Sequence, residues 1–185
     1  MAARNIHQFG DGIKIGYSDT NYVEVSAAGD INYVAGSGLQ FGEIYYMGAG
    51  FDTTCTTEDV YVQVLGFATN GESNGGVTPD HTNDHITVTY AGRYMISVNV
   101  SARSALADGY QFMVKCNNGT VDCENIMIHR DVATAARVVT GSCTGICDLP
   151  AGATVELWVR NIDTAGRDIT IEHVNLNVVQ VGGTT

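Results

Sequence analysis

Five cysteines are the residues of this 185-residue chain whose type and spacing most directly suggest chemistry. Cys116 and Cys123 are separated by six residues, Cys143 and Cys147 are four positions apart, and Cys55 is alone. Neither close spacing matches the Cys-x2-Cys pattern that is usual in structural zinc sites. A hairpin centred between Cys116 and Cys123 would place them within disulfide reach, whereas a bond between Cys143 and Cys147 would be strained. The alternative is that all five remain free thiols, as is usual in a protein without a secretory signal.

A short polar segment gathers the other candidate ligands. Asp80, Asn83 and Asp84 carry oxygens of the kind that calcium prefers, and they are weak candidates for a metal site. His81 and His85 are four positions apart, but this spacing aims two side chains together on a helix and not in a loop. We therefore expect a solvated loop here, with no metal and no cofactor.

Charge and motifs exclude several classes of function. The chain has 9 Lys and Arg residues against 20 Asp and Glu residues, which gives a formal net charge of −11. Such a surface repels phosphate backbones and anionic lipids, so neither nucleic acid nor a membrane is an expected partner. The sequence has no Gly-x-Ser-x-Gly, His-Glu-x-x-His or phosphate-loop motif, so we expect a protein that is not an enzyme.

Alternation of apolar and polar residues is the dominant pattern, and it predicts half-buried antiparallel strands. The predicted strands lie near residues 13–15, 22–25, 31–33, 60–65, 86–90, 96–100, 110–114, 155–159 and 169–178. In the last of these the apolar phase changes near His173 and Val174, which predicts a β-bulge. The polar, Gly-rich residues 69–84 are expected to form one long exposed loop. Only residues 104–107 and 132–137 have any helical character, one turn each.

The chain divides near residue 50 by composition. Residues 1–50 are rich in Gly and Ala and form an expected β stem that is too poor in large apolar groups to fold alone. Residues 57–182 hold about eight strands in series, as in an antiparallel sandwich or jelly roll. The predicted fold class is therefore all-β, with a stem and a head.

Exposed aromatic residues are the candidates for a subunit interface. Trp158 has the phase opposite to its apolar neighbours Val155, Leu157 and Val159, so its side chain is expected on the outer face of a sheet. It either anchors an interface or is covered by a loop. Three tyrosines are grouped with Trp158 as interface candidates: Tyr45, Tyr46 and Tyr61.

Three short motifs carry a resemblance to a known fold family. They are Ala91-Gly92-Arg93-Tyr94, the stretch Val114 to Gly119 that ends in Asn-Gly, and the Leu-x-x-Gly-x-x-Val-x-Leu pattern from Leu149 to Leu157. Residues 57–182 thereby resemble the jelly roll shared by tumour necrosis factor and the globular head of the first complement component. The chain departs from the family at Ala153, where Asp is frequent, and in its last strand. The resemblance implies a homotrimer.

A short Gly- and Ala-rich stem followed by such a head is similar to bacteriophage virion surface proteins, namely head fibres, capsid decoration proteins and small tail fibres. The first nine residues lack the apolar run of a secretory signal, which agrees with assembly in the host cytoplasm. The resemblance implies a structural protein at the virion surface, a trimeric head fibre or decoration protein that binds other virion proteins through residues 1–50.

Two other readings stay open. A tail fibre, receptor-binding tip or adhesin that binds carbohydrate, such as a host-surface glycan, would need aromatic residues gathered in one exposed groove. A small glycan depolymerase is a more distant alternative, because a sandwich of this length leaves little room for an elaborate cleft. Close cysteine pairs add one further expectation, a Cys116–Cys123 bond in mature particles with Cys55 free.

Overall fold

The computed structural model describes residues 5–9, 12–18, 21–26, 31–34, 39–132 and 137–183. Throughout these ranges the secondary structure is strand and turn, without helix, and the strands pair antiparallel. The predicted all-β fold is confirmed. Residues 104–107 form a bend and a loop, and most of the second segment with helical character lies outside the described residues.

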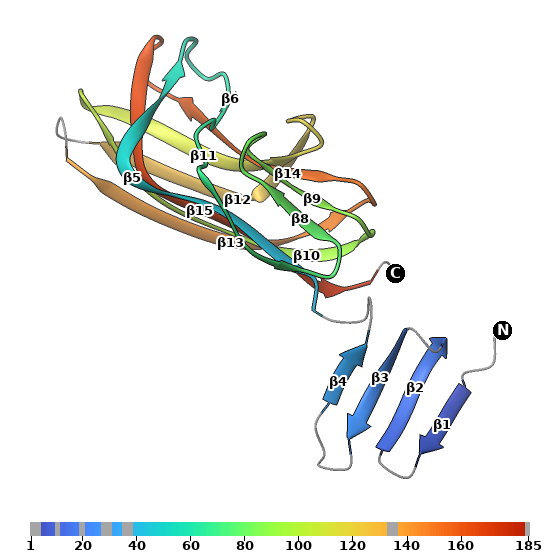
Figure 1. The fold of residues 1–185 in the computed structure, drawn as a ribbon. Coiled ribbons are helices and arrows are strands. Elements are labelled where there is room, and N and C mark those ends of the chain that lie inside the picture. Colours follow the sequence, from blue (N-terminus) through green and yellow to red (C-terminus); the bar gives the residue numbers. More distant parts are fainter. Residues whose placement is uncertain are drawn as a thin grey trace.

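The N-terminal strands form a small sheet of their own (Figure 1). It contains β1 (Asn5–Phe9), β2 (Gly12–Ser18), β3 (Asn21–Ser26) and β4 (Ile31–Val34), each paired with the next. The alternating apolar residues that predicted β2 and β3 occupy matched positions, with Ile13 opposite Val25 and Ile15 opposite Val23, whereas β1 was not predicted.

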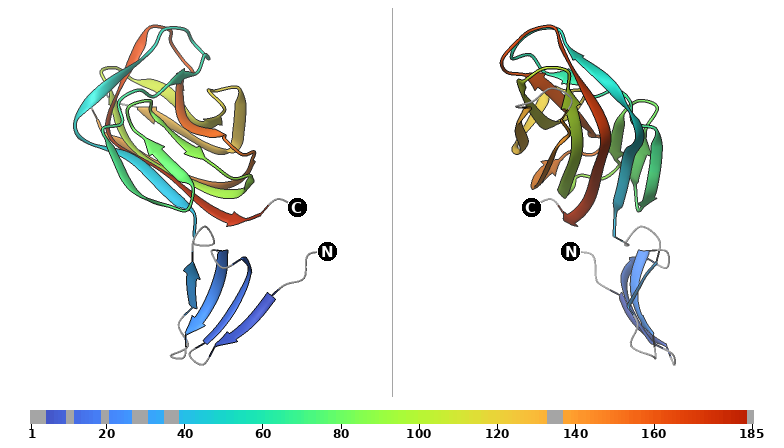
Figure 2. Two further views of the ribbon diagram at one scale, coloured as in Figure 1. Left: turned by 45° about the vertical axis from the view of Figure 1, so that its right-hand side comes forward. Right: turned by 90° about the vertical axis from the view of Figure 1, so that its left-hand side faces the viewer.

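The other strands form a sandwich of two sheets (Figure 2). The first sheet has the order β13-β10-β15-β5-β7, from β5 (Phe41–Cys55), β7 (Thr69–Asn74), β10 (Gly92–Ser104), β13 (Val139–Leu149) and β15 (Arg167–Gly182). The second has the order β12-β11-β14-β9-β8, from β8 (Val77–Asp80), β9 (His85–Val88), β11 (Asp108–Cys116), β12 (Val121–Val132) and β14 (Thr154–Asn161), and β6 (Val62–Gln63) pairs with β14. This order of crossovers is that of a jelly roll.

The core lies between the two sheets and follows from the alternation in the sequence. On β10 the residues Tyr94, Ile96 and Val98 are at most 1% exposed, and the residues between them face outward. On β14, Leu157 is buried in the same way from the opposite sheet. Burying one large side chain contributes roughly 1.5–3 kcal/mol, so these two strands supply much of the stability of the sandwich.

A bulge in β15 confirms the predicted change of phase. The pairing of β15 with β5 shifts between Ile171 and His173. Ile169 and Ile171 point into the core before the shift, and Val174 and Leu176 do so after it. The extra residue lets one long strand bury both of its apolar phases.

The structure corrects the expected loop over residues 69–84. Residues 69–80 form the edge strands β7 and β8, which belong to different sheets, and the turn between them lies at Gly75 and Gly76, whose φ angles of 70° and 94° suit glycine. β7 is polar because it lies at the edge of its sheet, where little of it is buried. The strand expected over residues 60–65 is also shorter than predicted, since only Val62 and Gln63 pair as strand.

Residues 41–50 belong to the first sheet of the sandwich. They form the first part of β5, which pairs with β15 from Phe41 to Cys55. The sequence analysis placed these residues in the N-terminal stem. In the structure they belong to the head, whose first strand begins at Phe41.

Candidate functional site

The outer face of the first sheet carries a row of apolar side chains that crosses four strands. The register places Ile146 opposite Met95, Met95 opposite Val179, and Val179 opposite Phe41. Ile146 is 55% exposed and Met95 is 36% exposed, while Val179 and Phe41 are half-buried. Apolar residues aligned across neighbouring strands on an open face are typical of a protein–protein interface.

Two polar rows continue this face along the strands. The register aligns Thr144, Ser97, Asn177 and Glu43 in one row, and Ser142, Asn99, Asn175 and Tyr45 in the next. Within the first row the Ser97 and Thr144 hydroxyls are 2.9 Å apart, and Asn175 Nδ2 of the second row donates to Glu43 Oε2 of the first at 3.1 Å. Amide and hydroxyl groups both donate and accept, so such rows can pair with copies of themselves.

A groove of about 770 Å³ lies over the last of these rows. Tyr45, Met47, His173 and Arg130 are among the side chains that line it. Met47 is 75% exposed, and Arg130 Nε donates to the carbonyl oxygen of Thr140 at 2.6 Å, which holds the guanidinium at the rim. The face therefore offers an apolar row at one end and, at the other, a groove lined by both apolar and polar side chains.

The four aromatic interface candidates do not form one patch. Tyr45 and Tyr46 lie on β5 in the first sheet, whereas Trp158 lies on β14 in the second, and Tyr61 is beside it. Of the two β5 residues, only Tyr45 belongs to the outward rows. Tyr46 packs edge-on against Phe51 at 4.9 Å and accepts a hydrogen bond from the Gly50 N–H at 3.1 Å.

Trp158 has the predicted outward phase and is covered by a loop. The turn after β11 lies over its ring. Gly119 in this turn is so close to the indole that a side chain at this position would collide with it. Gly119 also has a φ of 73°, where glycine is favoured. Trp158 Nε1 donates to the buried carboxylate of Glu156 at 3.0 Å. The ring is thus engaged within its own subunit rather than free as a binding platform.

A cation beside the aromatic rings completes this cluster. Lys115 Nζ lies 4.7 Å from the centre of the Tyr61 ring and 5.5 Å from that of Trp158, and it pairs with Asp122 at 2.9 Å. Burial raises the pKa of the Tyr61 hydroxyl, an effect that the neighbouring Arg160 opposes. On the outer face of the second sheet, the charged side chains and aromatic rings of this cluster therefore interact with one another.

The candidate calcium ligands use their oxygens to hold turns. Asp80 accepts hydrogen bonds from the backbone of Thr82 and Asn83 and from Asn83 Nδ2, and the bond from Asn83 Nδ2 is the main cause that lowers the pKa of the Asp80 carboxyl. The Asp84 carboxylate points elsewhere and accepts from the backbone N–H groups of Gly66 and Phe67. Across the described residues no group of three or more His, Cys, Asp or Glu side chains is arranged to hold a metal ion.

The thiols gather in a way that the sequence spacing did not indicate. Cys116 and Cys123 have their sulfurs 3.4 Å apart, but they are diagonal neighbours, because Cys116 pairs with Val121 across a four-residue turn. Cys147, on β13 of the other sheet, lines the same groove as Cys116 and Cys123.

The structure also bears on the expected Cys143–Cys147 bond and on Cys55. Cys143 and Cys147 are both on β13, and four residues of extended strand span about 13 Å, which is beyond the reach of a disulfide. A bond between them is therefore excluded. Cys55 is fully buried at the end of β5, and burial raises the pKa of its thiol.

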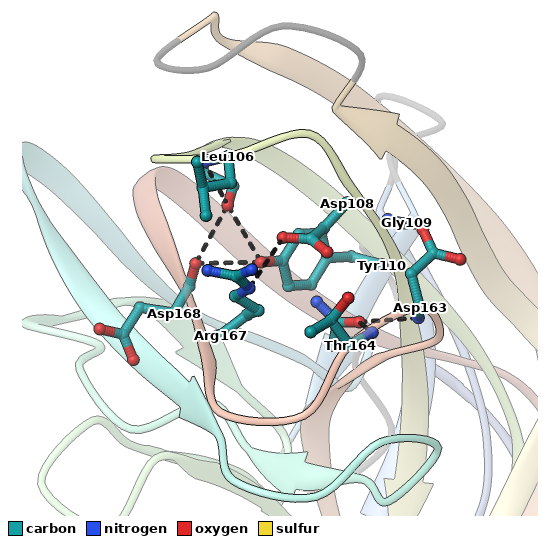
Figure 3. A network of polar contacts seen from close by, with 10 residues as sticks. Leu106, Asp108, Gly109, Tyr110, Asp163, Thr164, Arg167 and Asp168 are labelled. Carbon is teal, nitrogen blue, oxygen red and sulfur yellow. Dashed lines mark hydrogen bonds and ion pairs between the residues drawn. The ribbon is translucent and has the colours of Figure 1, made fainter.

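A buried polar network ties two loops together at one end of the sandwich (Figure 3). The Tyr110 hydroxyl donates to the Asp168 carbonyl at 3.0 Å, and the Gly109 N–H donates to Asp163 at 2.6 Å. Arg167 Nε lies 3.7 Å from Asp108, whose side chain is only 3% exposed. These contacts join the start of β11 to the β14–β15 connection and the start of β15, while Asp108 Oδ2 and Arg167 Nε are buried without a hydrogen-bond partner among the described residues.

Comparison with known proteins supports the fold. No family model matches the chain, and no curated protein matches it either. Among solved structures it is similar to the Eiger TNF of S. frugiperda, with 16% identity, a TM-score of 0.53, and coverage of 79% of this chain and 96% of the other. The globular domain of zebrafish complement 1qA is similar at 12% identity and a TM-score of 0.53, covering 78% of this chain and 99% of the other. Murine APRIL gives 11% identity, a TM-score of 0.50, and coverage of 77% and 100%.

These likenesses establish a jelly roll of the tumour necrosis factor and complement type, as the sequence motifs implied. At such low identity they show the fold alone. The described residues also contain no helix that is long and apolar enough to cross a membrane.

Proposed function

We propose that this chain is a non-enzymatic structural protein that forms a homotrimer through the outer face of the first sheet. The observation that carries the proposal is the apolar row of Ile146, Met95, Val179 and Phe41 beside rows of amide and hydroxyl groups. The fold is one that commonly forms trimers, and the neighbouring polar rows can hydrogen-bond to another copy.

The proposal extends to the surface of a bacteriophage particle, with a head fibre or decoration protein as the preferred type. Its support is the sequence resemblance, in which a Gly- and Ala-rich β segment precedes a jelly-roll head. In this proposal the four-stranded sheet of β1 to β4 attaches the trimer to other virion proteins. A role in glycan binding is less favoured, because Trp158 is engaged beneath a loop instead of lining an exposed aromatic groove.

A matched pair of substitutions tests the trimer face. Met95 and Met127 are both 36% exposed, but Met95 lies in the apolar row and Met127 lies on β12 of the second sheet. In the proposed trimer, each subunit would place a glutamate at position 95 in the contact. Burying these unpaired charges would raise the free energy of the trimer. We expect Met95→Glu to reduce the mass measured by light scattering from three chains to one, and Met127→Glu to leave it unchanged. A trimeric Met95→Glu protein would contradict this choice of face.

A truncation tests the attachment role. A chain that begins at Leu39 retains all of β5 and the strands that follow it. We expect it to remain folded and trimeric and to lose binding to particles that lack the protein, in a co-sedimentation assay with the full chain as control. Particle binding by the truncated chain would move attachment to the head, and mass spectrometry that finds no such chain in purified particles would refute the virion assignment.

A further inference from the structure

Three thiols from three strands meet at one edge of the sandwich. Cys116 on β11 and Cys123 on β12 have their sulfurs 3.4 Å apart, about 1.4 Å longer than a disulfide bond. Cys147 on β13 lines the same groove as both of these thiols and donates to Asn125 Oδ1 at 3.6 Å. Since β13 belongs to the other sheet, Cys123 has one thiol neighbour in its own sheet and one across the interface between sheets.

The three thiols differ in their access to solvent. Cys116 is 1% exposed and Cys123 is 6% exposed, whereas Cys147 is only half-buried. A groove of about 550 Å³ opens over all three. A small reagent that enters this groove therefore meets Cys147 before the buried pair.

Acidic side chains surround the opening of this groove. Asp122, Glu124 and Asp148 line it, and Lys115 is occupied by its ion pair with Asp122. Arg93 in turn pairs with Asp148 at 3.2 Å, so Glu124 is the carboxylate of the three without an ion pair among the described residues, and the groove keeps a negative charge within a chain whose formal net charge is −11. A reagent that carries positive charge is concentrated there, and one that carries negative charge is repelled.

We propose that these cysteines form a thiol–disulfide relay, in which Cys147 accepts oxidation from a small neutral or cationic disulfide and passes it through Cys123 to a final Cys116–Cys123 bond. The inference does not depend on the proposed virion role. It assigns Cys147 as the receiving thiol, Cys123 as the exchanging thiol and Cys116 as the final partner.

The relay has three balanced steps. The Cys147 thiolate attacks one sulfur of the external disulfide, a Cys147–sulfur bond forms, and one thiolate of the reagent leaves and takes up a proton. The Cys123 thiolate then attacks the sulfur of Cys147, which forms the Cys123–Cys147 bond and releases the second reagent thiol. Finally the Cys116 thiolate attacks Cys123 and releases Cys147. Overall, two protein thiols are oxidised by two electrons, one external disulfide is reduced to two thiols, and Cys147 is regenerated.

The closeness and burial of Cys116 and Cys123 favour this end point. Their bond closes a short hairpin loop, which restricts the unfolded chain and so stabilises the fold. Burial also shields the finished bond from external thiols, whereas a bond to Cys147 stays open to them. Desolvation and the hydrogen bond to Cys123 raise the pKa of Cys147 to about 12, so the first attack is slow at neutral pH.

The test follows disulfide formation in the full chain with cystamine, by quenching in acid, alkylation and non-reducing peptide mapping. We expect the wild type to end with the Cys116–Cys123 bond and Cys116→Ser to stop at a Cys123–Cys147 bond. Cys147→Ser should form the Cys116–Cys123 bond at least tenfold more slowly than the wild type. Cys143→Ser is the matched control, because Cys143 lies on the same strand and the same face as Cys147, and it should react at the wild-type rate.

Two results would overturn the relay. The first is formation of the Cys116–Cys123 bond at the wild-type rate in Cys147→Ser, with Cys147→Ala as a second variant that removes the polar atom. The second is the absence of a Cys123–Cys147 bond in Cys116→Ser. Oxidised glutathione, which is anionic, should react more slowly than cystamine by a factor that shrinks as salt is added, and a faster reaction with glutathione would refute the role of the acidic groove.

Discussion

Glu156 is a buried carboxylate at which the stability of the second sheet can be tested. It is 1% exposed and accepts three hydrogen bonds, from the Asn118 backbone N–H at 2.9 Å, the Thr154 hydroxyl at 2.6 Å and Trp158 Nε1 at 3.0 Å. These bonds connect the turn after β11 with two positions on β14. We predict that Glu156→Ala loosens this turn and exposes the indole of Trp158.

The magnitude follows from what the substitution leaves behind. Hydrogen bonds to a charged group contribute roughly 1.5–3 kcal/mol each, but the Asn118 N–H keeps a second acceptor in the Thr154 hydroxyl at 3.1 Å. The half-buried Trp158 N–H can be satisfied by water. We therefore expect the free energy of unfolding to fall by about 2–4 kcal/mol, and the melting temperature by about 5–15 °C.

Urea unfolding measured at one fixed protein concentration provides the assay, with circular dichroism for the sheets and fluorescence for Trp158, the single tryptophan of the chain. Glu156→Gln is the matched control, because it keeps the side-chain size and one acceptor oxygen and should lose only about 1–2 kcal/mol. A Glu156→Ala protein within 0.5 kcal/mol of the wild type, with unchanged fluorescence, would refute this account of the cluster.

Further predictions concern Asp84, Cys147 and the net charge of the chain. Asp84→Ala removes the acceptor of two backbone N–H groups at 2.8 Å and should cost about 2–4 kcal/mol, whereas Asp84→Asn should cost less than 1 kcal/mol by thermal unfolding. Burial raises the pKa of the Asp84 carboxyl in the folded protein above its ordinary value of 3.8. The contribution of Asp84 to the free energy of unfolding should therefore decline as pH rises from 3.8 to the folded-state pKa. The Asp84→Asn protein should not show this decline. Alkylation of Cys147 should accelerate about tenfold per pH unit from 7 to 11, and a plateau near pH 9 would indicate an ordinary thiol. Association of chains with a net charge of −11 should strengthen as salt rises, and weaker association at high salt would show that attractive charges hold the subunits together.

The strands with large inward side chains could be predicted from the sequence. On β10 and β14 every second residue is a large apolar group, and the structure buries these residues as expected. The phase change at His173 was also readable, since it is a local property of one strand.

β13 gave no comparable signal because its inward positions hold small residues. Gly141 and Gly145 face Ile128 and Ile126 of β12, which occupy the space that larger side chains would need. The apolar volume at this edge is supplied by the neighbouring strand, so no alternation appears in the sequence of β13 itself.

The candidate sites depended on contacts between distant segments and were therefore less predictable. The proximity of Cys116 and Cys123 is local to one hairpin, but the approach of Cys147 requires the crossover that places β13 beside β12. The apolar row on the first sheet also requires the registers of three strand pairs, of which the sequence specifies none directly.

The mass of the full chain in solution tests the proposed self-association most directly. Size exclusion coupled to light scattering, at micromolar concentration and physiological salt, should give about three times the chain mass of 19.6 kDa. The Met95→Glu protein should give a single chain mass under the same conditions. A wild-type protein that elutes as a monomer at this concentration would contradict the account.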